Sequence, residues 1–137
     1  MKENRQTALL VEDDADTAAV ETELLESDGF RVLYAPNAVE AVKLAGENRL
    51  DLVVLDVVLP DSDGLVLLIE LRRRCQAPVI VCSATNRHRD AVLALRLGAD
   101  DFVAKPFDIA EFEERVRAVM RRATPVTAPS PRAVRAA

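Results

Sequence analysis

Residues 51–64 read DLVVLDVVLPDSDG, and this stretch decides the fold. Its apolar run, Leu52–Leu55, is too short for a helix and is bounded by acids and turn residues, which predicts a strand buried on both faces. Such strands belong to parallel sheets that helices cover. Asp56 then stands at the carboxyl end of a buried strand, where open α/β sheets bind their ligands. An aspartate there can also simply cap the following loop, so the ends of the other strands must decide.

Four more strand-like runs alternate with helical patterns along the chain. The predicted strands are Ala8–Val11, Phe30–Ala35, Pro78–Cys82 and Phe102–Ala104. Apolar residues at helical spacing predict the helices. They are Ala18, Ala19, Val20, Leu24 and Leu25 in the first helix, and Val39, Val42 and Leu44 in the second. The third contains Leu65, Leu68, Ile69 and Leu71, the fourth runs from about Arg87 to Leu97, and the last contains Ile109, Phe112, Val116, Val119 and Met120. Five strands alternating with five helices predict a doubly wound α/β domain. Right-handed crossovers favour the flavodoxin-like (βα)5 fold, with a parallel five-stranded sheet in the order 2-1-3-4-5.

Composition excludes several classes of protein. The chain has 137 residues, half of them hydrophobic, with mixed charges, which is typical of one globular domain. No apolar run approaches the ~20 residues of a membrane span, and the N-terminus lacks a signal-peptide core. Cys75 and Cys82 have no metal-binding spacing, so we expect reduced thiols and a cytoplasmic protein. Residues 1–120 carry 14 Lys and Arg against 23 Asp and Glu, a net charge of −9, and this acidic body argues against direct binding of nucleic acid by the domain.

The end of the chain differs from the rest. Residues 123–137 contain three prolines and no apolar stripe, a composition typical of linkers. We therefore predict a folded domain over residues 1–122 and a flexible tail, or the start of an interdomain linker, over residues 123–137. The four arginines of residues 121–137 are too few to indicate a nucleic-acid site.

Chemically matched side chains follow four of the predicted strands. Glu12 and Asp13 end the first, Asp56 the third, Ser83 the fourth and Lys105 the fifth. Three converging carboxylates repel one another unless a cation neutralises them, and an all-oxygen ligand set suits Mg²⁺. A carboxylate nucleophile, a metal, a hydroxyl and an ammonium group are the parts needed to transfer a phosphoryl group onto an aspartate, and Asp56 is the candidate nucleophile.

Each of these residues also has an ordinary structural interpretation. Adjacent acids often begin a helix, a lone Ser83 more often satisfies a backbone group, and a lone Lys105 is more often a surface residue. Their coincidence at one edge of the sheet favours the functional interpretation.

Several motifs together resemble the receiver domain of a two-component response regulator, from about Thr7 to Arg122. They are Val11-Glu12-Asp13-Asp14, the block from Asp56 to Gly64, Ser83-Ala84, and the block from Gly98 to Phe107. The resemblance implies that Asp56 accepts a phosphoryl group from a sensor histidine kinase. It implies further that Asp13, Asp56 and the backbone carbonyl of Val58 bind Mg²⁺, that Glu12 acts through water, and that Ser83 and Lys105 contact the phosphoryl group. The Lys105-Pro106 bond is typically cis in such proteins.

The resemblance also implies a switch and an output surface. Phosphorylation would draw Ser83 and Lys105 inward, and the aromatic Phe102 would turn into the vacated space, although Phe102 can also be an ordinary core residue. The chain is most similar to the winged-helix transcription-factor subfamily, whose receivers dimerise through the fourth helix, fifth strand and fifth helix. The expected interface residues are Val92, Leu93, Asp100, Asp101, Glu111 and Arg115. Ala91 stands where that subfamily commonly has a basic residue paired with Glu111, which predicts a weaker or altered dimer.

We therefore expect a signalling switch that is not an enzyme with an external substrate. DNA binding would need an output domain that this sequence lacks, so the chain is a receiver fragment or a stand-alone receiver acting by protein contact. An aspartate-nucleophile phosphatase is an alternative, because Asp14-Ala15-Asp16-Thr17 resembles its loop, but Asp16 falls within a helix and no cap domain is present. A flavin-binding domain lacks its phosphate loop. Because neither Val58 nor Thr85 can orient water, we expect self-dephosphorylation over hours.

Overall fold

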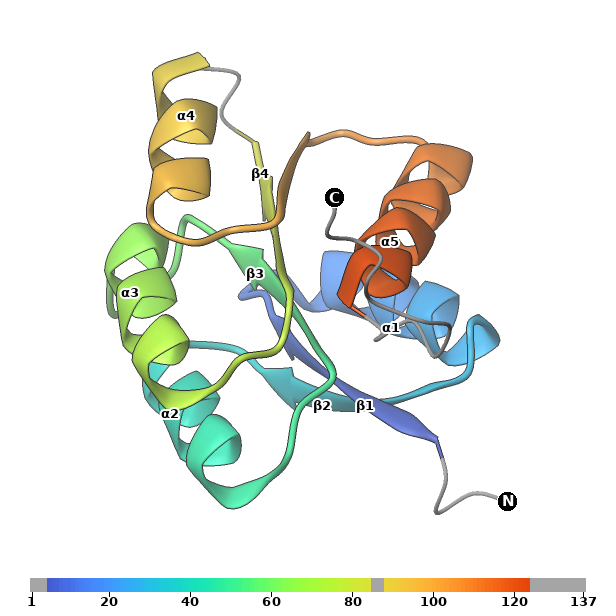
Figure 1. Ribbon diagram of the computed structural model, residues 1–137, viewed down its shortest axis with the longest axis horizontal. Helices are drawn as coiled ribbons and strands as arrows, with labels where there is room; N and C mark the ends of the chain where they lie inside the picture. Colours follow the sequence, from blue (N-terminus) through green and yellow to red (C-terminus); the bar gives the residue numbers. More distant parts are fainter. Residues whose placement is uncertain (1–4, 85–87, 124–137) are drawn as a thin grey trace, which may run out of the picture.

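The computed structural model describes residues 5–84 and 88–123 as a five-stranded parallel sheet with helices on both faces (Figure 1). The strands are β1 (Gln6–Val11), β2 (Phe30–Ala35), β3 (Leu52–Asp56), β4 (Val79–Ser83) and β5 (Asp101–Ala104). The helices are α1 (Ala15–Ser27), α2 (Ala38–Glu47), α3 (Gly64–Arg74), α4 (His88–Arg96) and α5 (Ile109–Ala123). Strands and helices alternate along the described chain as the sequence predicts, and the bounds of the strands differ by at most two residues from the prediction.

The strand order is β2-β1-β3-β4-β5, which confirms the predicted topology. Val11 of β1 lies beside Leu55 of β3, so the residues after them, Glu12 and Asp56, emerge next to each other. Asp56 in turn lies beside Cys82 of β4. This register brings the carboxyl ends of the parallel strands to one edge of the sheet.

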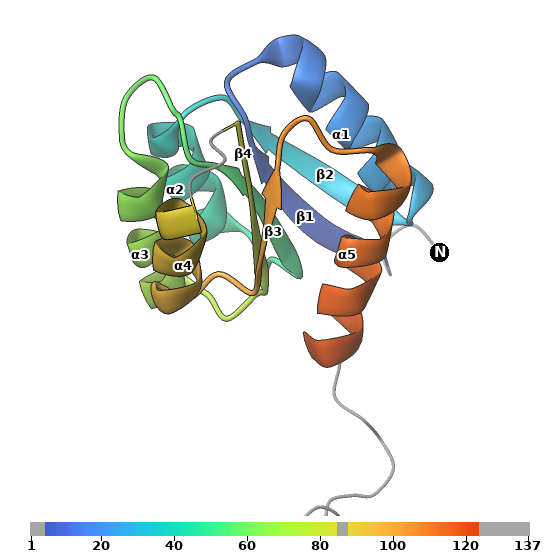
Figure 2. The same cartoon turned by 90° about the horizontal axis from the view of Figure 1, so that it is seen from above.

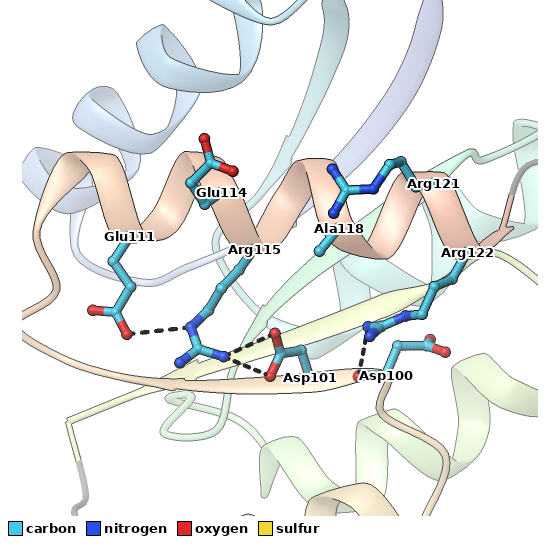
Figure 3. Close-up of a pocket in the computed structure, with 8 residues that line it drawn as sticks. All are labelled: Asp100, Asp101, Glu111, Glu114, Arg115, Ala118, Arg121 and Arg122. Carbon is cyan, nitrogen blue, oxygen red and sulfur yellow. Dashed lines mark hydrogen bonds and ion pairs between the residues drawn. The ribbon is translucent and has the colours of Figure 1, made fainter.

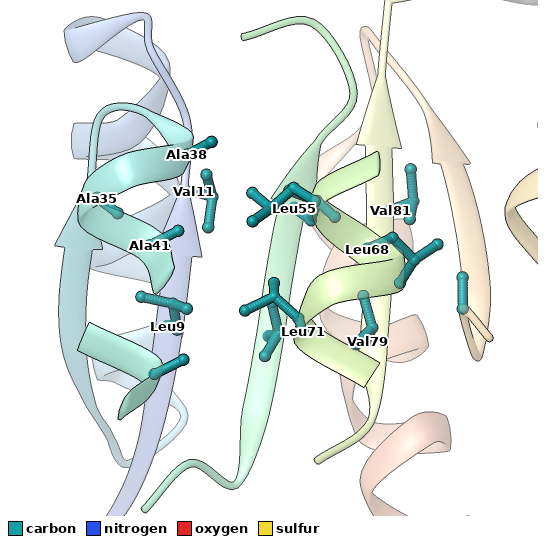
Figure 4. Close-up of a cluster of buried hydrophobic side chains, with 14 of the residues drawn as sticks. Leu9, Val11, Ala35, Ala38, Ala41, Leu55, Leu68, Leu71, Val79 and Val81 are labelled. Carbon is teal, nitrogen blue, oxygen red and sulfur yellow. The ribbon is translucent and has the colours of Figure 1, made fainter. Parts of the chain in front are cut away.

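Alternate strand residues point to opposite faces of the sheet and fill two separate cores. Helices α2, α3 and α4 cover one face, and α1 and α5 cover the other (Figure 2). Figure 4 shows the first core, in which strand residues such as Leu9, Leu55 and Val81 meet Ala41 of α2 and Leu68 of α3. In the second core, Leu10, Val54 and Cys82 lie among residues of α1 and α5. The interior strands β1, β3 and β4 are therefore buried on both sides.

Side chains of the preceding residues begin several helices. Asp14, Asn37 and Asp63 each accept a hydrogen bond from a backbone N–H in the first turn of α1, α2 and α3. Gly64 opens α3 where the chain passes very close to itself, because a Cβ at this position would lie 2.6 Å from the carbonyl oxygens of Asp56 and Val57.

The helix faces differ in part from the sequence prediction. On α1, Val20 is half exposed, whereas Glu21 is buried with Ala18 and Leu25. On α2, Val39 is exposed and the buried residues are Ala38, Ala41 and Ala45, because small side chains let the helix approach the sheet closely. On α3 and α5, Ile69 and Ile109 are exposed and lie outside the buried stripes.

Some predictions concern parts of the chain outside the described residues. Thr85, the start of the fourth helix near Arg87, and the predicted linker from Thr124 onward all lie there. Within residues 5–84 and 88–123, no helix combines the length and apolar character needed to cross a lipid bilayer.

Candidate functional site

Three carboxylates gather where β1 and β3 end. Glu12 and Asp13 directly follow β1, and Asp56 is the last residue of β3. One carboxylate oxygen from each lies within 4.8 Å of the others. Glu12 and Asp56 are buried, and Asp13 is exposed at the mouth of the group. We call these three residues the acidic cluster.

Lys105, one residue after β5, supplies the cation of the site. Its Nζ donates a hydrogen bond to Oε1 of Glu12 and lies 3.5 Å from Oδ2 of Asp56. Burial alone would lower the pKa of Lys105, but the hydrogen bond to Glu12 and the charges of Asp56 and Glu12 raise it above its ordinary value. The ammonium group therefore stays charged. The Lys105-Pro106 peptide bond is cis, as the resemblance implied.

Hydrogen bonds hold both the side chain and the backbone of Glu12. The backbone N–H of Asp14 donates to Oε2 of Glu12 over 3.2 Å, and the hydroxyl of Tyr34 donates to its backbone carbonyl over 2.7 Å. Burial raises the pKa of the Glu12 carboxyl, and the hydrogen bond from Lys105 offsets this only in part. A buried carboxylate of this kind is stabilised by any further positive charge placed beside it.

The donor set of the acidic cluster fits a hard divalent cation. Its ligand atoms are all carboxylate oxygens, which suit Mg²⁺, and exposed Asp13 leaves the cluster open to solvent and to phosphate oxygens. Asp56 is further oriented by the backbone N–H of Val58, which donates to its Oδ1 over 3.1 Å. The role of the Val58 carbonyl as a metal ligand, and that of Glu12 through water, stay predictions.

The loop between β3 and α3 is fixed at several points. Gly64 donates its N–H to the carbonyl of Val57 over 2.7 Å, and Val58 pairs with Asp63 in an isolated antiparallel bridge. Asp61 reaches across to α2, where its carboxylate accepts the backbone N–H groups of Ala38 and Val39. The backbone that follows Asp56 is thereby closed on itself and tied to a neighbouring helix.

The predicted switch residues lie on β4, which neighbours β3, and on β5, which neighbours β4. Ser83, the last residue of β4, is fully buried, and its carbonyl accepts the N–H of Lys105 over 2.7 Å. Phe102 of β5 lies beside Val81 and packs, partly buried, against the core on the α2, α3 and α4 side. Ser83 therefore lies next to the site, whereas Phe102 lies one strand further from Asp56, and the movement of both residues stays a prediction.

The predicted interface residues lie on α4, on α5, and in or directly before β5. Arg115 donates to both carboxylate oxygens of Asp101, at 3.0 and 3.1 Å, and to Glu111 at 3.2 Å (Figure 3). Leu93 and Leu95 of α4 are exposed, and Val92 is partly buried. Glu111 thus pairs with Arg115 within the domain, whereas Ala91 offers no basic side chain with which Glu111 could pair. Beside these ion pairs, Asp100, Arg121 and Arg122 help to line an open cavity of about 520 Å³.

Three residues near the site were not identified from the sequence. Tyr34 and Asp61 act through contacts between distant segments, which a local pattern does not reveal. Glu21 could have been found, because it lies three residues after Ala18 and four before Leu25, on the face of α1 that packs against the sheet. The acids proposed for a phosphatase loop lie elsewhere: Asp14 caps α1, and Asp16 is exposed in its first turn.

Comparisons with protein families and with known proteins find similar sequences. Residues 8–117 match the family model described as the response regulator receiver domain. The transcriptional regulatory protein CpxR of Klebsiella pneumoniae is 43% identical over 114 residues, which are 83% of this chain and 49% of that protein. The KDP operon transcriptional regulatory protein KdpE of Escherichia coli is 40% identical, over 90% of this chain and 55% of that protein. The chain thus spans about half the length of these relatives.

Solved structures share the fold. A two-component response regulator from Clostridium difficile has a TM-score of 0.84 at 27% identity, with 88% of this chain and all of that chain covered. The BeF3-activated N-terminal receiver domain of RstA from Klebsiella pneumoniae has a TM-score of 0.80 at 28% identity, covering 85% of this chain and 99% of that one.

Proposed function

Because the chain belongs to the response regulator receiver domain family, we propose that Asp56 is the residue whose phosphorylation operates the switch. The observation that carries this assignment is the contact of Asp56 with Lys105 inside the acidic cluster. Asp56 is the cluster member that comes from β3, and both of its oxygens have positioned neighbours, the Val58 N–H and the Lys105 ammonium.

The proposed reaction moves a phosphoryl group from a phosphohistidine of a sensor kinase to Asp56. One carboxylate oxygen of Asp56 forms the new P–O bond, and the P–N bond to the histidine breaks, with its electron pair returning to the ring nitrogen. Lys105 is placed to neutralise charge on the phosphoryl oxygens, and Ser83 would offer a hydroxyl donor from the adjacent strand. The protein catalyses only its own modification, so it is a signalling domain and not an enzyme with an external substrate.

Asp13, Asp56 and the Val58 carbonyl would hold Mg²⁺ directly, and Glu12 would contact it through water. When bound, the cation would neutralise the carboxylates and screen the incoming phosphoryl group. The residues of this chain set its place, because Lys105 fixes Glu12 and the Asp14 N–H fixes the second oxygen of the same carboxylate.

Phosphorylation by acetyl phosphate tests the assignment directly. We expect the wild-type chain to gain the mass of one phosphoryl group when Mg²⁺ is present, and Asp56→Asn to gain none. Asp14→Asn is the matched control, because Asn caps a helix as well as Asp does and Asp14 lies outside the cluster. Phosphorylation that survives Asp56→Asn and is lost in Asp14→Asn would overturn the proposal in favour of the phosphatase-like alternative.

We further propose that the receiver controls a DNA-binding output domain. The support is that CpxR and KdpE are named as transcriptional regulators and that this chain spans about half of each. A stand-alone receiver that acts through protein contacts is the second candidate, supported by exposed Leu93 and Leu95 on α4. A cytoplasmic location, where a sensor kinase delivers the phosphoryl group, is part of the same proposal.

Dimerisation through α4, β5 and α5 belongs to this proposal and is tested by sedimentation. Beryllofluoride, which stands in for the phosphoryl group, should convert the chain from monomer to dimer. Leu93→Asp should keep it monomeric, whereas Val66→Asp, also exposed but on α3, should not. Equal dimerisation in both variants would place the interface elsewhere.

The lifetime of the modified state follows from what surrounds Asp56. Val58 is 63% exposed beside it and has no group that can orient an attacking water. We propose that the phosphoryl group is lost over hours. Loss within a minute, measured after removal of acetyl phosphate in the presence of Mg²⁺, would refute this.

A further inference from the structure

Glu21 is a buried carboxyl group without a hydrogen-bond partner in the described part of the chain. Only 1% of its surface is exposed, and neither carboxylate oxygen has a partner there. It lies on the stripe of α1 formed with Ala18 and Leu25, which are both members of the core between α1, α5 and the sheet. A buried carboxyl without a partner is costly in its charged form, so its place in the structure needs an explanation.

The charged groups that act on Glu21 belong to the proposed phosphorylation site. Lys105 after β5 favours the charged form of Glu21, and Glu12 after β1 and Asp56 of β3 oppose it. Cys82 of β4 is the other titratable neighbour, and burial raises its thiol pKa well above the ordinary value.

The remaining elements packed against this core contribute apolar groups. They are Phe30 and Val32 of β2 and Phe112, Val116 and Val119 of α5. The charge state of Glu21 is therefore controlled by burial and by the acidic cluster with its lysine, and not by a counter-ion of its own.

Burial raises the pKa of Glu21 to about 7, with Lys105 lowering it and Glu12 and Asp56 raising it. A proton on Glu21 is thus held weakly enough at neutral pH that a change of charge in the cluster can move it. Adding positive charge there favours loss of the proton, and adding negative charge favours its retention.

We propose that Glu21, buried on the face of α1 that packs against the sheet, is a proton-binding site that releases its proton when a divalent cation binds to the acidic cluster and regains it when the cation leaves. This inference rests on the proposed function, because it takes Glu12, Asp13 and Asp56 as the cation site. By linkage, Mg²⁺ binds more tightly as pH rises through neutrality, and a phosphoryl group on Asp56 stabilises the protonated form of Glu21.

Calorimetric titration with Mg²⁺ in two buffers of different ionisation enthalpy measures the proton release. At neutral pH we expect the wild-type chain to release a fraction of one proton per Mg²⁺, and its affinity to rise about fivefold more between acidic and alkaline pH than that of Glu21→Gln. Glu21→Gln, which keeps the shape and cannot ionise, should release almost none. Glu23→Gln, an exposed acid on the same helix, is the control and should match the wild type.

The outcomes separate this inference from the proposed function. If Mg²⁺ binds and Glu21→Gln releases as many protons as the wild type, the coupling is wrong while the cation site stands. If Mg²⁺ does not bind to the wild-type chain, the cation site is wrong and the coupling falls with it.

A second measurement needs no variant, in case Glu21→Gln does not fold. In ¹³C NMR of the wild-type chain, the side-chain carboxyl of Glu21 should titrate near neutral pH and shift to lower pH when Mg²⁺ is added. Titration of this carboxyl at the ordinary glutamate pKa, or a midpoint that does not move with Mg²⁺, would overturn the proposal.

Discussion

Two clusters of opposite charges, one at the edge of the sheet and one that joins α5 to β5, differ in their exposure to water. In the first, Lys105 lies against Glu12 and Asp56, and all three are buried or nearly so. In the second, Arg115 pairs with Asp101 and Glu111, whose side chains remain partly exposed.

The difference between the two clusters lies in what balances the charges. Around Arg115, water and salt screen each ion pair, so each contributes little to stability. At Lys105, one ammonium faces two buried carboxylates, and Asp13 adds a third carboxylate to the group. Because this excess of negative charge is buried, it favours an added cation. Arg115 also faces two carboxylates, but their side chains are partly exposed and water screens the excess charge.

The largest effect is expected from Lys105→Met. The change leaves the buried carboxylates of Glu12 and Asp56 without their cation, which should lower the free energy of unfolding by about 4 kcal/mol at neutral pH. Mg²⁺ should restore part of the loss. Chemical denaturation measures both, with Lys43→Met on the exposed side of α2 as control. A loss no larger than that of the control would mean that burial does not distinguish the two clusters.

The second effect has the opposite sign. The pKa of Glu21 is raised from 4.5 to about 7 in the folded protein. Protonation of Glu21 therefore contributes fully to the free energy of unfolding below pH 4.5, and this contribution is lost as pH rises through 7. The free energy of unfolding of Glu21→Leu, relative to that of the wild type, should therefore increase by about 3 kcal/mol across this pH range. Denaturation midpoints at several pH values test this, and a pH-independent difference would contradict it.

A third, smaller effect comes from the cation itself. Mg²⁺ at ten times its dissociation constant should stabilise the wild-type chain by about 1.4 kcal/mol, and it should act much less on Asp56→Asn. Thermal unfolding shows this, with sodium chloride of matched ionic strength as the control. Equal stabilisation by both salts would mean that the acidic cluster holds no ion.

The smallest effect is expected at the α5 cluster. Arg115→Met should cost at most about 1 kcal/mol, and the cost should shrink as salt screens the pairs with Asp101 and Glu111. Arg73→Met, at an exposed position of α3, is the control. A salt-independent loss of several kcal/mol would remove the contrast between the two clusters.

The strands and the core of the site were predictable because their signals are local. Short apolar runs ending in Glu12, Asp56, Ser83 and Lys105 predict both the sheet and the edge where these residues lie. The parallel order then brings Glu12 beside Asp56, as the register between β1 and β3 confirms. The strand order then places these residues together, because each of them lies at the carboxyl end of its own strand.

What the sequence did not reveal depends on contacts between segments. The sequence predicted Val39 in the pattern of α2, but alanines face the sheet, because the space between helix and sheet decides which side chains fit. The exposed carboxylate of Asp61 reaches α2 across more than twenty residues, and no pattern along the chain predicts that contact. Glu21 is a charged residue type at a buried position, where the helical pattern predicts an apolar one.

Gly64 gives the site an unusual sensitivity to mutation. Its hydrogen stands where even the methyl group of alanine would collide with the carbonyl oxygens of Asp56 and Val57. Replacement would have to push aside the backbone that carries the phosphoacceptor itself. A single added carbon atom at position 64 would therefore disturb the site, although Gly64 itself is not part of the acidic cluster.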